Sequence, residues 1–178
     1  MFGRYENFPE TVHSVAFFNF QDSVKSIQQA VLCVFHRLNQ EVYDLGAVTP
    51  YLKGKCEVSF EFGVAEGDAF NFLDENELDQ CLQNIKEKEI QTLDFFLVVR
   101  YHITGDSGGR VPLRFDYHVL RLKFQEDCLE IWVRHEKGTR RLQLDDLTYF
   151  LVRRINVELS RRRLNPLVLA HFKKVGLQ

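Results

Sequence analysis

Residues 93–144 read LDFFLVVRYHITGDSGGRVPLRFDYHVLRLKFQEDCLEIWVRHEKGTRRLQL, and apolar side chains alternate with polar ones through most of this stretch. Such alternation is typical of β-strands that bury one face, and the breaks between the runs are rich in Gly, Asp and Glu. The stretch therefore predicts a meander of four antiparallel strands. We expect its turns at Gly105–Arg110, at Glu126-Asp127 and at residues 135–138.

The register of the first hairpin follows from matching apolar residues with apolar partners across the two strands. This rule pairs Tyr101 with Phe115, and on the opposite face it pairs Arg100 with Asp116. Along the second strand the apolar positions change from odd to even near Val119. The change predicts a β-bulge at that point or, alternatively, a strand whose middle is buried on both faces.

In the second hairpin the same rule pairs Leu122 with Ile131, and a return strand after the third turn pairs Ile131 with Leu142. Asp145 or Asp146 then caps a long helix, which ends at Arg161-Arg162-Arg163 before Asn165-Pro166. Leu167–Val175 is expected to form a short helix.

Before residue 93 the chain alternates between strands and helices. The predicted elements are a strand at Val12–Phe20, a helix at 23–42 capped by Asp22 or Ser23, a strand at 56–62, and a helix that follows Asp74. The order β-α-β-α-β-β-β-β-α predicts an α+β fold in which helices pack on one face of an antiparallel sheet of about six strands, with a long C-terminal helix. We expect a single domain over residues 1–178, with 164–178 as a short C-terminal extension.

Composition limits the class of protein. The chain has 178 residues, of which 45% are hydrophobic and 27% charged, so a disordered chain is excluded. No apolar run is long enough to span a membrane, and the N-terminus does not resemble a signal peptide. The four cysteines lack the spacing of a metal site, which predicts free thiols and a cytoplasmic location.

Charge is distributed unevenly along the chain. Residues 1–109 contain 8 basic and 17 acidic residues, whereas residues 110–178 contain 15 basic and 8 acidic ones. The two halves either attract each other within one fold or bind charged partners. Association between copies, acidic half against basic half, would give a homo-oligomer.

Motifs for catalysis or cofactors are absent: the sequence contains no P-loop, GxGxxG, GxSxG, HExxH or EF-hand pattern, and we predict no metal and no cofactor. The predicted registers bring one group of titratable side chains to a common sheet face. Its members are Arg100, His102, Arg114, Asp116 and His118. The group is either a solvated face with a cross-strand ion pair or an acid–base pair, and without a nucleophile–base pair an enzyme is the least supported class.

The most informative pattern is basic and surrounds the single tryptophan. The predicted registers place Trp132 across from Arg121 on one side and Arg141 on the other, on the sheet face away from the core. Further cations extend this face. The complete predicted site is Arg121, Lys123, Trp132, Arg134, Arg140, Arg141, Arg161, Arg162 and Arg163.

An aromatic ring among guanidinium groups is typical of single-stranded nucleic-acid binding, of protein interfaces, and of structural cation–π packing. The sequence therefore favours a non-catalytic binding protein whose basic face takes an acidic protein or a single-stranded nucleic acid. The alternatives are the homo-oligomer and a small-molecule binder with a Phe-lined cavity between the sheet and the last helix.

Overall fold

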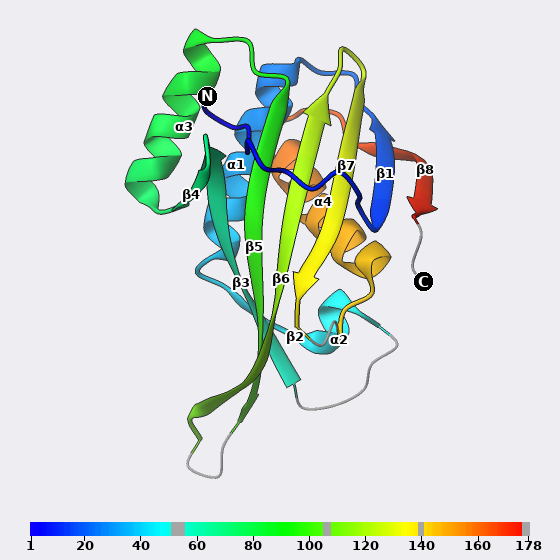
Figure 1. The fold of residues 1–178 in the computed structure, drawn as a ribbon. Coiled ribbons are helices and arrows are strands. Elements are labelled where there is room, and N and C mark those ends of the chain that lie inside the picture. The colour runs from blue at the N-terminus through cyan, green and yellow to red at the C-terminus, as the bar shows by residue number, and fades with distance from the viewer. Residues whose placement is uncertain (51–55, 105–107, 139–140, 176–178) are drawn as a thin grey trace.

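The computed structural model describes residues 1–50, 56–104, 108–138 and 141–175, and these form eight strands and four helices (Figure 1). In chain order the elements are β1 (Ser14–Asn19), α1 (Val24–Leu38), β2 (Val42–Asp44), α2 (Leu45–Val48), β3 (Cys56–Glu66), β4 (Ala69–Phe72), α3 (Glu75–Glu87), β5 (Thr92–Thr104), β6 (Arg110–Phe124), β7 (Cys128–Lys137), α4 (Leu144–Arg161) and β8 (Val168–Lys174).

The strands form one sheet in the order β2-β3-β5-β6-β7-β1-β8, and β4 pairs with β3 beside this path. Every pairing is antiparallel, so the predicted α+β class is confirmed. The strand count exceeds the predicted six because β2, β4 and β8 were not predicted as strands, whereas one predicted strand, the return strand after the third turn, has no counterpart among the described residues. Strands β2 and β4 have only three and four residues, too few to show an alternating pattern.

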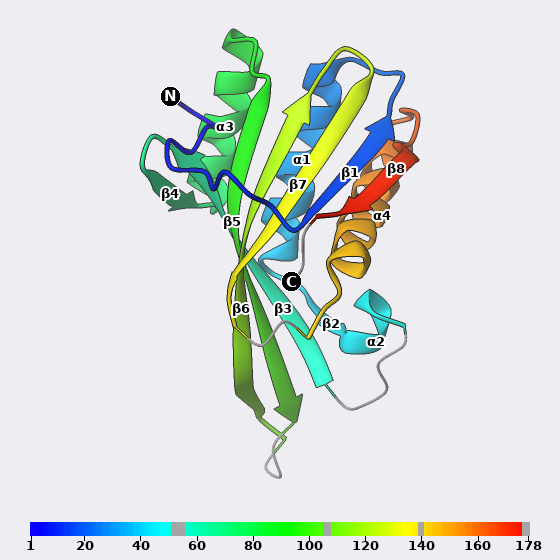
Figure 2. The same ribbon diagram turned by 45° about the vertical axis from the view of Figure 1, so that its right-hand side comes forward.

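The helices α1 and α4 pack against one face of the sheet, which we call the inner face. Both lie behind the sheet in Figure 1, and Figure 2 shows α1 passing behind β7. Phenylalanine rings fill the space between these layers. Phe35 of α1 stacks on Phe62 with ring centres 4.2 Å apart, and Phe60 stacks on Phe150 of α4 at 5.4 Å. These rings are buried and belong to the core, and the Phe-lined cavity of the small-molecule alternative stays a prediction.

The helix starts follow the predicted capping chemistry in two cases. The Ser23 hydroxyl accepts a hydrogen bond from the Ser26 amide at 3.1 Å, and Asp74 accepts one from the Glu77 amide at 2.8 Å. The last helix differs from the prediction because Gln143 occupies its N-cap and Asp145 and Asp146 lie in its first turn. There the carboxylates still face the positive end of the helix. Among the described helices, none combines the length and the apolar character that a membrane span requires.

The predicted register of the β5–β6 hairpin is wrong by one residue. Tyr101 pairs with Arg114 instead of Phe115, and Val99 pairs with Asp116. The matching rule failed because it compares cross-strand partners alone: the observed register joins Phe95 to Leu120 but also pairs Leu97 with His118. Which face is buried against the helices then decides the register.

The strand β6 is buried on both faces at its middle, as one of the two alternatives predicted. Leu120 is buried on the inner face, and Val119 is only 4% exposed on the opposite, outer face. The β6–β7 register shifts between Tyr117 and His118, two residues before the position predicted for a bulge.

The register of the β6–β7 hairpin is otherwise confirmed, with Leu122 opposite Ile131. The predicted return strand is wrong: Ile131 pairs on its other side with Ala16 of β1, and the described residues 141–143 form no strand. Leu142 is buried where the chain turns into α4. The first strand of the chain occupies this place, and a hairpin rule that considers only neighbouring segments does not find it.

The short helix predicted at Leu167–Val175 is also wrong, because this segment forms the edge strand β8 on β1. Its Phe172 packs against Tyr149 of α4, with ring centres 5.7 Å apart. The predicted extension is therefore part of the sheet as far as Val175, which donates a backbone hydrogen bond to His13.

Candidate functional site on the outer face of the sheet

The N-terminal segment, residues 2–13, crosses the outer face in front of β5, β6 and β7 before it enters β1 (Figure 1). Backbone hydrogen bonds hold it in place. The Gly3 amide donates to the Ala65 carbonyl at 2.8 Å, and the Tyr5 amide donates to the Asp94 carboxylate at 2.8 Å. The sequence analysis assigned no structure to residues 2–11.

A buried ion pair lies beneath this segment. Asp94 of β5 is fully buried and accepts hydrogen bonds from Nε and Nη2 of Arg121 at 2.8 and 2.7 Å. The same guanidinium lies 4.0 Å from the ring centre of Phe8. The pair therefore joins β5, β6 and the N-terminal segment, and Arg121 is held in place by its partners.

Trp132 lies half-buried on the outer face of β7, with Arg121 across from it on β6 as predicted. Its neighbour on the other side is Val15 of β1, where the prediction placed Arg141. The Lys123 ammonium lies 4.9 Å from the indole centre. The indole N–H is buried and has no hydrogen-bond partner among the described residues.

The remaining predicted cations of this face have carboxylate neighbours. Lys123 Nζ lies 3.8 Å from Glu130 Oε2, and Arg134 Nε lies 3.3 Å from Glu136 Oε1. Arg134 also donates to the Thr11 side chain at 2.7 Å. Positive and negative groups therefore alternate around Trp132, and the charge available to an acidic partner is smaller than the sequence suggested.

The other predicted cations lie elsewhere. The Arg141 guanidinium lies 5.9 Å from the ring of Tyr101, a core residue, and Arg140 falls outside the described residues. Arg161 and Arg162 end α4 on the helical side of the molecule, where both bind Glu158, and Arg163 is exposed beyond them. The structure therefore brings together Arg121, Lys123, Trp132 and Arg134 from this predicted site.

Glu158 explains the position of the arginines that end α4. It is buried and also binds Arg37 of α1 at 3.0 Å. Burial raises the pKa of this carboxyl, but the hydrogen bonds from Arg162 and Arg37 outweigh burial and hold its pKa below the usual range. These cations therefore join two helices.

The predicted titratable group is divided between the two faces. Arg100 and His102 lie on the outer face of β5, where Arg100 binds Glu61 at 3.1 Å and His102 Nε2 lies 2.9 Å from Ser59 Oγ. The shifted register turns Asp116 and His118 to the inner face, where both are fully buried, and Arg114 is exposed. The prediction that His102 and His118 share one sheet face is therefore wrong.

Asp116 is the centre of a buried polar cluster on the inner face. It accepts a hydrogen bond from the Tyr101 hydroxyl at 2.6 Å, and His135 Nε2 lies 3.4 Å away. The His118 and His135 rings meet edge to face at 5.1 Å. Burial, together with the bond to Asp116, raises the pKa of Tyr101 far above its usual range, so this hydroxyl stays protonated and acts as a donor.

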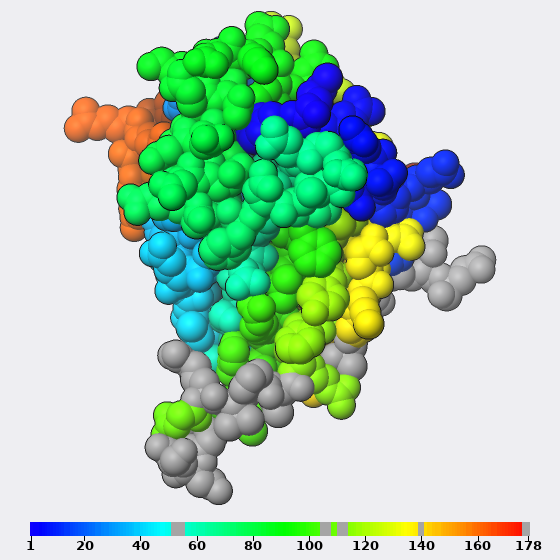
Figure 3. Space-filling view, turned by 60° about the vertical axis from the view of Figure 1, so that its left-hand side comes forward, coloured from blue at the N-terminus to red at the C-terminus, as the bar shows by residue number. Residues whose placement is uncertain are grey.

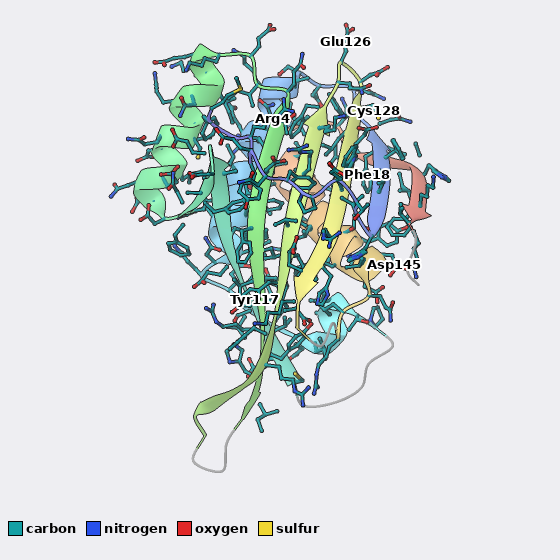
Figure 4. The ribbon with its side chains drawn as sticks, viewed as in Figure 1. Arg4, Phe18, Tyr117, Glu126, Cys128 and Asp145 are labelled. Carbon is teal, nitrogen blue, oxygen red and sulfur yellow. The ribbon has the colours of Figure 1, made fainter. Side chains whose placement is uncertain are left out.

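A groove lined by aromatic rings lies on the outer face beside the N-terminal segment. Rings from four separate segments follow one another: Tyr5 to Phe70 at 4.6 Å, Phe70 to Phe96 at 5.6 Å and Phe96 to Tyr117 at 5.5 Å between centres. Phe115, which is 47% exposed, continues the row at 6.0 Å from Tyr117. Figure 4 labels Tyr117 on β6.

The groove has a volume of about 780 Å³. We call it the aromatic groove, and its lining residues are Tyr5, Asn7, Pro9, Phe70, Phe96, Tyr117, Val119, Glu136 and Lys137. Figure 3 shows this side of the molecule, with β5 and β6 at the surface between β4, β7 and the N-terminal segment. Gly63 keeps the Phe70 wall in place, because a Cβ at this position would lie only 3.2 Å from the Cβ of Phe70.

The groove was not predicted from the sequence. The predicted register, shifted by one residue, puts Tyr117 on the buried face of the hairpin. One signal was present: β5 has apolar residues at even as well as odd positions, including Phe96 and Val98. An antiparallel strand that is apolar on both faces has a second surface to cover or to bind with.

Among the described residues, no three His, Cys, Asp or Glu side chains lie close enough together to hold a metal ion. The chemistry that the outer face offers is aromatic stacking, apolar contact and a few charged groups at the rim. Comparison with models of protein families, with curated proteins and with solved structures found no match for this chain.

Proposed function

We propose that this chain is a non-catalytic binding protein and that its aromatic groove takes an extended segment of a partner protein. The observation that carries the proposal is the continuous row of half-exposed rings contributed by the N-terminal segment, β4, β5 and β6. Aromatic side chains are enriched at protein interfaces, and a row of exposed rings on a soluble domain is costly unless it is used.

The N-terminal segment supports an extended peptide as the occupant. It is itself an extended chain that lies on this face, places the Phe8 ring against the Arg121 guanidinium and donates a backbone hydrogen bond to Asp94. Tyr5, Asn7 and Pro9 of the same segment form one wall of the groove, so a second extended chain would continue a packing that is already present.

The charged groups of the outer face favour the predicted acidic or nucleic-acid partner less. Phosphates need cations that are free to bind them, whereas Arg121, Lys123 and Arg134 each contact a carboxylate. Binding to nucleic acid and homo-oligomer formation remain predictions. The four cysteines lie in the described part of the chain and are free, which supports the proposed location in the reducing cytoplasm.

The test is a selection of 12-residue peptides from a random displayed library, followed by fluorescence anisotropy with the selected peptides. Phe96→Ala combined with Tyr117→Ala removes the middle of the ring row, and we expect affinity to fall at least tenfold. Phe72→Ala is the matched control, because Phe72 is 52% exposed on β4 and does not line the groove. We expect it to bind as the unmodified chain does.

Peptides that bind the double variant as well as the unmodified chain, or a library that yields no groove-dependent binder, would overturn the proposal. A labelled 20-nucleotide oligo-dT is the competing probe. If it binds with a steep dependence on salt and loses affinity in Trp132→Ala but not in the groove variant, the nucleic-acid prediction replaces the peptide proposal.

A further inference from the structure

We infer that the segment bound by the aromatic groove is basic, and that an Arg or Lys side chain of the partner stacks on Phe96 and Tyr117. This inference rests on the proposed function, because it states the chemistry of the occupant of the same groove. It reverses the sign of the charge that the sequence suggested for a partner.

The first support is a pattern repeated on the outer face. Arg121 lies 4.0 Å from the ring centre of Phe8 and is held by Asp94. Lys123 lies 4.9 Å from the centre of Trp132 and 3.8 Å from its carboxylate partner, Glu130. In each unit a cation contacts an aromatic face while a carboxylate fixes the cation, which is the geometry of a stabilising cation–π contact.

The groove holds a stacked ring pair on which no cation of the described residues lies. Phe96 and Tyr117 are stacked at 5.5 Å with ring planes 29° apart. Glu136, whose Oε1 lies 3.3 Å from Arg134 Nε, also lines the groove. Within the described part of the chain, the Lys and Arg side chains that contact an aromatic face contact rings other than Phe96 and Tyr117. Those rings are Phe8, Trp132, Tyr101 and Tyr43. A partner guanidinium or ammonium would supply a cation for this pair of rings.

The charges beside Tyr5 also favour a basic segment. Exposed Glu6 and Glu66 flank the turn between β3 and β4, where the Glu6 amide donates to the Gly67 carbonyl at 2.9 Å and Asn71 donates to Glu66 at 3.3 Å. Exposed carboxylates next to the groove attract a basic peptide and raise its association rate.

Lys137 is the one cation among the described residues that line the groove, and it lies across from Tyr117 in the β6–β7 register. It provides a test of sign. A basic occupant is repelled by this ammonium, so Lys137→Gln should strengthen binding, whereas an acidic occupant would lose a partner and bind more weakly.

The experiment compares three labelled 12-residue probes in which Ser alternates with Arg, with Gln or with Glu. By fluorescence anisotropy, we expect the Arg probe to bind at least tenfold more tightly than the Gln probe, and the Glu probe to bind most weakly. Phe96→Leu keeps an apolar side chain but removes the ring face, and should weaken the Arg probe about three- to tenfold. Glu136→Gln should weaken it about two- to fivefold.

Two matched controls separate this site from general attraction to an acidic protein. Glu75→Gln removes one exposed carboxylate from the first turn of α3, and Phe72→Leu removes one exposed ring outside the groove. Both should leave the affinity for the Arg probe within twofold. The inference is overturned if the Gln probe binds as tightly as the Arg probe, if Phe96→Leu has no effect, or if Lys137→Gln weakens binding.

These outcomes separate the inference from the function on which it rests. If neutral library peptides bind and depend on Phe96 and Tyr117, while the Arg probe shows no preference, the peptide-binding function stands and the basic class is wrong. If neither the library nor the probes bind in a groove-dependent way, both fail.

Discussion

Replacing Asp94 of β5 with Asn removes the charge that binds both the N-terminal segment and Arg121 of β6. The carboxylate is fully buried and accepts three hydrogen bonds, two from Arg121 and one from the Tyr5 amide. The amide of Asn keeps one acceptor but turns an N–H group toward Arg121 or toward the backbone. We therefore expect a large loss of stability from a single isosteric change.

The magnitude follows from the burial of the two partners. Removing one partner of a fully buried ion pair costs about 3–5 kcal/mol, because the remaining charge stays buried without an opposite charge beside it. The Arg121 side chain is 15% exposed and can recover part of its hydration. We expect Asp94→Asn to lower the free energy of unfolding by about 2–4 kcal/mol, equivalent to a fall in Tm of roughly 5–15 °C for a chain of this size.

Urea unfolding measures this loss, and hydrogen exchange locates it. The Tyr5 amide should exchange faster in the variant, because Asp94 is its acceptor. In a double-mutant cycle with Arg121→Gln, the combined loss should fall short of the sum of the single losses by about 1–3 kcal/mol. Glu130→Gln is the control, because it breaks the more exposed pair with Lys123 and should cost less than about 1 kcal/mol.

The reasoning is refuted if Asp94→Asn costs no more than Glu130→Gln and leaves the exchange of the Tyr5 amide unchanged. That result would mean that the N-terminal segment is held by its apolar contacts alone. One wall of the aromatic groove would then be independent of the ion pair.

Two other perturbations give defined outcomes. Gly138 has a φ of 112°, and a Cβ there would lie 2.3 Å from Asp116 Oδ1, so Gly138→Ala should lower the free energy of unfolding by about 2–4 kcal/mol in urea titrations. Glu158→Gln should cost about 1–2 kcal/mol at pH 7. The folded pKa of Glu158 is lowered, so its stabilisation is present above the unfolded pKa and is lost as the pH falls through the folded pKa. The difference in stability between the two proteins should therefore shrink as the pH falls below the ordinary glutamate pKa of about 4.3. A difference that grows in acid would contradict the assigned ion pairs.

Local patterns predicted much of the architecture. Ser23 and Asp74 mark helix starts because a cap depends on residues three positions away, and the turn after Phe124 sets the β6–β7 register because only a few residues separate the strands. The placement of Arg121 beside Trp132 follows from that register and is confirmed. These predictions depend on short stretches of chain.

The candidate site depends on contacts that such stretches do not contain. The β5–β6 hairpin is apolar on both faces, so the burial of Leu120 against the helices, and not the pattern along the strand, decides that Tyr117 lies on the outer face. Likewise Trp132 has Val15 as its second neighbour, from a strand more than a hundred residues earlier.

The α+β class, two helix starts and one hairpin can be predicted from the amino-acid sequence, because capping and strand alternation act within a few residues. The side of β5 and β6 that faces the helices, and the path of the N-terminal segment across the outer face, are set by tertiary packing. Both depend on burying apolar surface between segments that are distant in the chain. The hydrophobic effect that drives this burial is non-directional, so no short stretch of sequence shows which segments will meet. The row of rings from Tyr5 to Phe115 results from that packing.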